Sequence, residues 1–111
     1  MNTAMKRYVR QLSDLVSFEP GKGPKADLFR GDRLFVGLNC FEPGQSQPPH
    51  VHAGADKFYY VVSGRARFTV ADESCEAAAG AVVWAPADVP HGVEQALERT
   101  VMLVGIAPPP R

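Results

Sequence analysis

The sequence contains three histidines, and their spacing is typical of a metal site. His50 and His52 form a His-x-His pair, and His91 follows much further along the chain. In a strand, residues two apart face the same side about 6.6 Å from each other, so both imidazoles can reach one ion at about 2.0 Å. A third imidazole must come from a different strand, which leaves His91. The spacing predicts a site for a divalent transition metal such as zinc, nickel, copper, iron or manganese.

Such a site needs strands to hold it, and strand signals cover most of the chain. Residues 34–41 alternate between two faces with a period of two. The runs 58–62 and 65–70 are separated by Ser63-Gly64, which is typical of a β-hairpin. Further short strands are expected at 75–77, 81–85, 91–95 and 100–106. Frequent turn residues and the lack of a long helical pattern predict an all-β sandwich or barrel.

The two ends of the chain have weaker patterns. Residues 4–16 carry apolar side chains at helical spacing, but Tyr8-Val9 could open a strand, so we expect a short strand and then one helical turn. Residues 18–24 contain two prolines and two glycines, which favours a surface loop. The prolines in 107–111 cannot donate to a sheet ladder, so we expect this tail to be extended and exposed.

Composition narrows the possible partners. A chain of 111 residues has room for one domain. Its 12 basic and 12 acidic residues give a formal net charge of zero, which argues against nucleic acid and anionic membranes as partners. The apolar stretches are far shorter than the roughly 20 residues that a membrane span requires. The first residues lack the apolar run of a secretory signal, and no CxxC pair occurs, so we expect a cytoplasmic protein.

The histidine pair lies within a longer spaced pattern. Gly44 is followed after five residues by His50 and His52, then after four residues by Lys57, and after six more by Gly64. This resembles the first motif of the cupin superfamily, in which a glutamate occupies the position of Lys57.

The third histidine lies within a second pattern with similar agreement. Gly80 is followed after five residues by Pro86, then by Asp88, His91 and Gln95. This resembles the second cupin motif, with Asp88 in place of a glycine and Gln95 in place of an asparagine. Asp88 is compatible with the turn because Asp adopts a positive φ more readily than most residues.

The resemblance covers nearly the whole chain and implies a fold. It implies an all-β, antiparallel double-stranded β-helix, that is, a jelly-roll barrel formed by residues 25–106. Residues 1–24 would be an N-terminal strand, turn and loop, and residues 107–111 a tail. Inside the barrel, His50, His52 and His91 would hold the metal. The resemblance also implies a homodimer, because cupins commonly pair through a sheet whose open edge needs cover.

Lys57 is the substitution with the largest consequence, because an ammonium beside a dication is repulsive. Four outcomes are open: the lysine loses its proton, swings away on its flexible stem, pairs with an anionic ligand, or no metal binds. Asp56 could restore a carboxylate only if the strand slipped by one residue, which would invert every side chain that follows. Some cupin dioxygenases use three histidines without the glutamate, so the metal site does not depend on it.

Several other side chains are candidates for the same interior. Tyr59 shares the face of Lys57 and Gln95 shares that of His91, so we expect both near a ligand, Tyr59 with a catalytic role beside Lys57 or as plain core lining. Cys40 could face the metal, although free cysteine is usually a small buried apolar residue. Arg65 and Arg67 flank the hairpin turn on one face. We expect this face to be solvated, and the alternative is a rim that binds anions.

These residues favour two classes of function. The first is a metal-dependent enzyme acting on a small molecule, an oxygenase or an isomerase, with Lys57 stabilising an anionic intermediate. The second is a non-catalytic sensor or storage module that binds a small anion through Lys57 without metal. A third reading is a barrel that mainly serves dimerisation. No nucleophile motif, phosphate loop or carboxylate pair supports a hydrolase, kinase or glycosidase.

Overall fold

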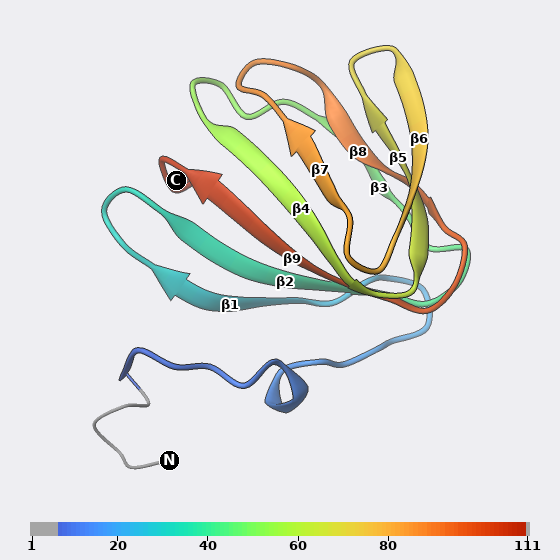
Figure 1. Cartoon of the computed structure of the whole chain (residues 1–111), viewed down its shortest axis with the longest axis horizontal. Coiled ribbons are helices and arrows are strands. Elements are labelled where there is room, and N and C mark those ends of the chain that lie inside the picture. The colour runs from blue at the N-terminus through green and yellow to red at the C-terminus, as the bar shows by residue number, and fades with distance from the viewer. Residues whose placement is uncertain (1–6, 111) are drawn as a thin grey trace.

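The computed structural model describes residues 7–110, which fold into two antiparallel sheets (Figure 1). A 3-10 turn, η2 (Leu12–Asp14), precedes the strands. The five-stranded sheet has the order β1-β2-β9-β4-β7 and the four-stranded sheet the order β3-β8-β5-β6. The strands in chain order are β1 (Lys25–Arg30), β2 (Phe35–Phe41), β3 (Gln47–His50), β4 (Asp56–Ser63), β5 (Arg65–Val70), β6 (Glu73–Ala78), β7 (Val82–Ala85), β8 (His91–Ala96) and β9 (Thr100–Ala107). The predicted all-β barrel is confirmed.

The inner faces of the two sheets enclose the main core. Tyr59 of β4 and Phe68 of β5 are fully buried, and their ring centroids lie 5.0 Å apart across the space between the sheets. Val61, Val93 and Met102 complete the centre of this cluster with no exposed surface. The alternation of the strands therefore buries one face of each sheet against the other, as in a β-sandwich.

A second, smaller core lies on the outer face of the five-stranded sheet. Leu38, Cys40 and Val101 are buried there beneath the N-terminal segment, whose apolar side chains at positions 12, 15, 16 and 18 pack onto them. Figure 1 shows this segment running alongside β1 and β2 without joining the sheet. The helical turn expected here is confirmed. The short strand expected at Tyr8-Val9 is wrong within the described residues, because this segment buries side chains on the sheet face instead of pairing its backbone with an edge.

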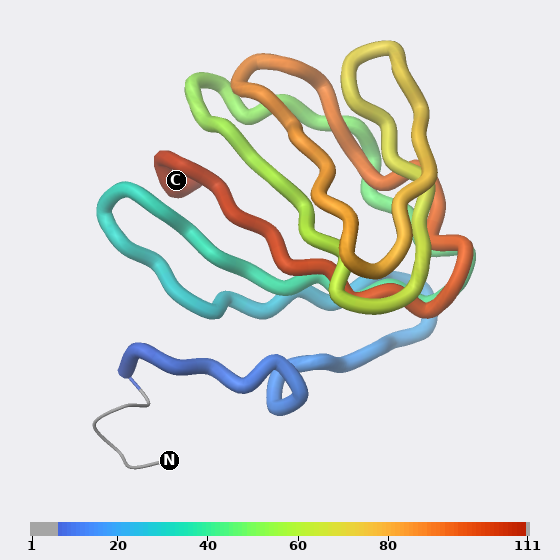
Figure 2. The backbone as a smooth tube through the Cα atoms, viewed as in Figure 1, coloured from blue at the N-terminus to red at the C-terminus, as the bar shows by residue number. Residues whose placement is uncertain are grey.

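The predicted hairpin of residues 58–62 and 65–70 is also wrong. β4 pairs with β7 on one side and β9 on the other, so it has no free edge for β5. β5 pairs instead with β6 and β8 in the other sheet. Gly64 makes the crossing with a φ of +84°, and a side chain there would collide with the Arg99 carbonyl and with Thr100. The backbone tube in Figure 2 follows this passage from one sheet to the other.

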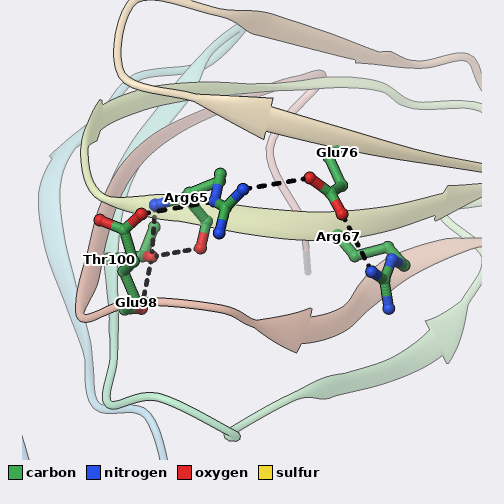
Figure 3. Close-up of polar contacts among 5 residues, drawn as sticks. All are labelled: Arg65, Arg67, Glu76, Glu98 and Thr100. Carbon is green, nitrogen blue, oxygen red and sulfur yellow. Dashed lines mark hydrogen bonds and ion pairs between the residues drawn. The ribbon is translucent and has the colours of Figure 1, made fainter.

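The outer face of the four-stranded sheet carries paired charges (Figure 3). Glu76 accepts from Arg65 at 3.4 Å and from Arg67 at 3.0 Å, and Arg65 also lies 3.3 Å from Glu98. The buried Thr100 hydroxyl donates to the Arg65 carbonyl at 3.0 Å and so ties this sheet to the start of β9. These arginines are balanced by the chain's own glutamates, which favours the solvated-face interpretation over an anion-binding rim.

The C-terminal tail differs in part from its expectation. Ala107 and Pro108 are exposed, as predicted, but Pro109 and Pro110 are half-buried. The Pro110 carbonyl accepts a hydrogen bond of 2.7 Å from the Arg30 guanidinium, which holds the tail against β1. Among residues 7–110 we find no helix of the length and apolarity needed to cross a bilayer.

Candidate metal centre

The three histidines come together at one end of the space between the sheets. His50 ends β3 and His91 begins β8, and the two residues are direct partners in the ladder. His52 lies just beyond β3, so the strand positions His50 and the loop after it positions His52. One nitrogen from each ring lies within 4.8 Å of the others, and these residues form a cluster that could hold a metal ion. The predicted convergence of the three imidazoles is confirmed.

Backbone carbonyls fix the orientation of two of these rings. Nδ1 of His50 lies 3.1 Å from the Pro48 carbonyl, and Nδ1 of His91 lies 2.9 Å from the Val89 carbonyl. A carbonyl can only accept, so each Nδ1 carries the proton and each Nε2 presents a lone pair. Nε2 of His91 is buried and has no hydrogen-bond partner among residues 7–110. A buried nitrogen left without a partner is costly, and a metal ion is a partner that would satisfy it.

The electrostatic surroundings keep these rings neutral. Burial lowers the pKa of all three histidines, and the Lys57 ammonium lowers each further. The pKa of His52 falls to about 4. Neutral imidazole is the form that binds metal, so these shifts favour the protonation state in which the cluster could coordinate an ion.

Lys57 lies inside the barrel, as its place in the cupin motif implies. It is only 4% exposed and pairs with Ala85 and Ile106 on the inner face. Its Nζ lies 4.5 Å from the centre of the Tyr59 ring. Burial and the nearby Lys25 lower its pKa to about 8. The side chain therefore does not swing out to solvent, which removes one of the four outcomes considered above.

The strand holding Lys57 has not slipped. Asp56 is exposed, and its carboxylate accepts a hydrogen bond of 2.9 Å from the Ala87 amide outside the barrel. Asp88 adopts a φ of +67°, and its carboxylate accepts from the Gly54 amide at 2.9 Å. The positive φ expected of Asp88 is confirmed. The turn before His91 thus keeps its shape without the glycine of the motif.

Tyr59 lies beneath the site and does not open onto it. Its side chain is fully buried, and burial raises the pKa of its phenol. The hydroxyl donates a hydrogen bond of 2.8 Å to Oε1 of Gln47. Because Oε1 accepts this bond, the orientation of the Gln47 amide is fixed, and its NH₂ group has no hydrogen bond within the described part of the chain. Gln47 lines the cavity beside the histidines. The core-lining interpretation of Tyr59 is supported, and Gln47 is a site residue that the sequence analysis missed.

Gln95 does not share the interior with His91, and this expectation is wrong. β5 and β8 pair Phe68 with Val93 but Arg67 with Gln95, so β8 contains one extra residue, Glu94. This β-bulge shifts the alternation by one position. Gln95 is consequently exposed on the same face as the ion-paired Arg67.

Cys40 is also remote from the site. It is buried on the opposite face of the five-stranded sheet, under the N-terminal segment. Burial raises the pKa of its thiol, so it is held in its unreactive form. The structure supports its interpretation as a small apolar core residue. Cys75 is exposed and free.

A cavity of about 560 Å³ opens beside the cluster. Its walls come from β1, β2, β3, β4, β9 and the tail. The polar and charged residues that line it are Lys25, Asp27, Arg30, Asn39, Gln47, His50, His52 and Lys57. Its apolar lining includes Phe35, Val104 and Ile106. This cavity is half-open to solvent, and it combines apolar walls with convergent polar groups, as small-molecule sites commonly do.

The fold and the site together define a jelly-roll barrel with a three-histidine cluster that could hold a metal ion. Residues 37–106 match the family model described as the cupin domain. This span covers more than half of the chain and contains all three histidines. The chain belongs to the cupin family.

Individual proteins show the same relationship. An uncharacterized protein of Streptomyces coelicolor is 38% identical over 89 residues, which cover 78% of this chain and 82% of the relative. The crystal structure of TT1209 from Thermus thermophilus is 36% identical, covers 92% of this chain and 98% of its own, and superposes with a TM-score of 0.86. An RmlC-like cupin protein from Desulfovibrio desulfuricans is 30% identical, with coverages of 86% and 91% and a TM-score of 0.78.

Proposed function

We propose that this cupin binds a divalent transition metal through His50, His52 and His91, and a small molecule in the adjacent cavity. The observation that carries the proposal is the buried Nε2 of His91, which has no partner among the described residues. In both His50 and His91, Nδ1 donates to a backbone carbonyl, which leaves the lone pair of Nε2 available to a metal. Three neutral imidazoles suit zinc, nickel, copper, iron or manganese, and they leave coordination positions for a ligand.

The reaction class that this arrangement supports best is a metal-dependent oxygenation or isomerisation. A bound metal would supply Lewis acidity to an oxygen of the ligand. Lys57 lines the same cavity and places a positive charge where negative charge would develop on the ligand. Gln47, fixed by Tyr59, offers a hydrogen-bond donor, and the apolar walls could contact the carbon skeleton of the ligand. Tyr59 contributes by positioning Gln47.

A non-catalytic module remains the second candidate, because one observation favours it. Lys57 occupies the position of the family's glutamate and repels a cation instead of binding one. In this reading the cavity binds an anion without metal. Both readings fit the cytoplasm proposed as the location, since both cysteines are free thiols.

Metal analysis separates the two candidates. The protein is purified without a histidine tag, loaded with each of the five metals in turn, and dialysed before elemental analysis. We expect close to one ion per chain for wild type and a loss of at least tenfold in affinity for His91→Ala. Gln95→Ala, in the same strand but on the exposed face, is the matched control and should keep its metal.

A folded wild-type protein that retains none of the five metals would contradict the proposal and exclude the metal centre. Equal metal content in wild type and His91→Ala would place the ion elsewhere. Circular dichroism of each variant establishes that the barrel is intact.

A further inference from the structure

The cavity beside the histidines is lined by hydrogen-bond donors that have no partner among residues 7–110. Lys57 is 4% exposed, and its ammonium forms neither an ion pair nor a hydrogen bond in this part of the chain. Asn39 is also 4% exposed, and its amide likewise forms no hydrogen bond there. The Gln47 amide accepts from Tyr59, which leaves its NH₂ group without a bond among the same residues. These donors reach the open space of the cavity, since Nε2 of His91 is the one sealed side-chain atom without a partner in the described residues, and a ligand that accepts hydrogen bonds could therefore bind them.

A second group of charges lies along the β1 wall of the cavity. β1 has one extra residue, Leu28, between the partners of Gly37 and Val36. This bulge lets Lys25, Asp27 and Arg30 all line the cavity, although strict alternation would turn Arg30 to the other face. Lys25 and Arg30 lie near the ends of the strand, with Asp27 between them.

Arg30 is held in place before any ligand binds. Its Nη2 donates to the Pro110 carbonyl at 2.7 Å, and its guanidinium lies 5.4 Å from the centre of the Phe35 ring. These contacts leave other N–H groups of the guanidinium free. A side chain already ordered loses less conformational entropy when it binds an anion. The β1 wall therefore offers an anion a positive charge whose side chain is already ordered.

The charges of the cavity do not balance. Three cationic side chains, Lys25, Arg30 and Lys57, face a single carboxylate, Asp27. A dication at the histidines would add to this excess. The fields of Lys57 and Lys25 already reach the histidines, where both lower the pKa of His50 and His52. An anionic ligand would offset this potential.

We propose that the cavity recognises a small organic acid with two carboxylates. One carboxylate binds Lys57, with Gln47 and Asn39 as donors, beside the histidine cluster. The other reaches Lys25 and Arg30 on the β1 wall. The inference rests on the proposed function in taking this cavity as the ligand site, and it adds the chemical class of the ligand.

Two four-carbon acids test the proposal. Succinate has a carboxylate at each end and butyrate has one, so a comparison of their binding isolates the second carboxylate. Isothermal titration calorimetry is performed on metal-loaded and metal-free protein at low ionic strength, where surface charges are least screened. We expect succinate to bind at least about fivefold more tightly than butyrate, from two exposed charge contacts.

Substitutions assign each charge to its carboxylate. Lys57→Met should weaken both acids by roughly tenfold or more, since it removes a buried charged donor. Lys25→Gln and Arg30→Gln should weaken succinate by about two- to fivefold and leave butyrate unchanged. Asp27→Asn, on the same wall, should tighten succinate by a similar factor. Lys22→Gln is an exposed control outside the cavity and should change neither acid.

The outcomes separate this inference from the metal proposal, because metal content is measured on the same samples. Equal affinities for succinate and butyrate overturn it, as does weaker succinate binding by Asp27→Asn. Stoichiometric metal without succinate binding leaves the metal centre standing and excludes the dicarboxylate. Succinate binding with the expected variant pattern but without metal supports this inference and contradicts the metal centre. Lys57→Gln is the second variant if Lys57→Met does not fold.

Discussion

At the scale of the residue, Lys57 should reduce the stability of the metal-free protein. The side chain is 4% exposed and forms no ion pair among residues 7–110, and contact with the Tyr59 ring offsets only part of the lost hydration. We expect Lys57→Met to raise the free energy of unfolding by about 1–3 kcal/mol at pH 7. Urea denaturation followed by circular dichroism measures the change. A less stable variant would show that the ammonium has a favourable partner.

The same lysine predicts a pH dependence of known sign. The pKa of Lys57 is about 8 in the folded protein and about 10.5 in the unfolded chain. Between these values the unfolded state binds more protons, so the stability contributed by this group rises with pH. The advantage of Lys57→Met over wild type should therefore shrink as the pH is raised from 8 to 10.5. Urea midpoints of both proteins at several pH values test this, and a gap that stays constant would contradict it.

The spacing of the histidines was sufficient to predict their cluster. A chelating pair and a third imidazole in a separate strand leave few arrangements in an all-β chain. The sequence could not show that Gln47 belongs to the site or that Gln95 does not. Each lies beside a register shift, in β3 and β8, and a shift of one residue reverses the face that alternation assigns. Nothing in the local residue pattern marks these positions.

At the scale of the element, strand positions were predicted well and strand partners were not. The strands at 34–41, 58–62, 65–70 and 100–106 all form near their predicted positions. A tight glycine turn between two strands has the same local pattern whether the chain folds back or crosses to another sheet. The difference arises because β7 and β9, distant in sequence, occupy both edges of β4. The choice of partners for β4 therefore depends on the tertiary structure and cannot be predicted from the local sequence.

The crossing at Gly64 should tolerate no side chain. Its φ is +84°, and an added Cβ would collide with the Arg99 carbonyl and with Thr100. We expect Gly64→Ala to destabilise the protein by about 3 kcal/mol or more, from backbone strain together with the collision. Gly54→Ala is the matched control, because its φ of +69° is similar but its Cβ would meet open space. That variant should lose only about 1–2 kcal/mol. Equal losses in thermal unfolding would mean that φ alone decides the cost.

At the scale of the whole molecule, the outer face of the five-stranded sheet is covered only in part. The N-terminal segment packs over Leu38 and Cys40. Further across the sheet, Tyr60, Val82 and Trp84 are 37%, 64% and 56% exposed, and the last two lie on the edge strand β7. Exposed apolar residues on a sheet face and edge are typical of a contact surface.

The homodimer stays a prediction, and this surface is where we expect it to form. Trp84→Glu places a charge in the centre of the exposed patch and should shift the mass measured by light scattering from two chains to one. Leu34→Glu is the control, since Leu34 is 48% exposed in the turn between β1 and β2. It should leave the mass unchanged. A monomeric wild-type protein would exclude the homodimer.

The extra residue Glu94 suggests how barrels of this kind acquire new chemistry. Insertion of one residue in β5 between Arg67 and Phe68 would give Glu94 a partner and remove the bulge, and regular alternation would then turn Gln95 to the inner face that carries Val93 and His91. A change in chain length of one codon would thus move an amide from the solvent-facing side of the sheet to the interior. In such a scaffold, insertions and deletions of single residues can change which side chains line the interior as effectively as substitutions do.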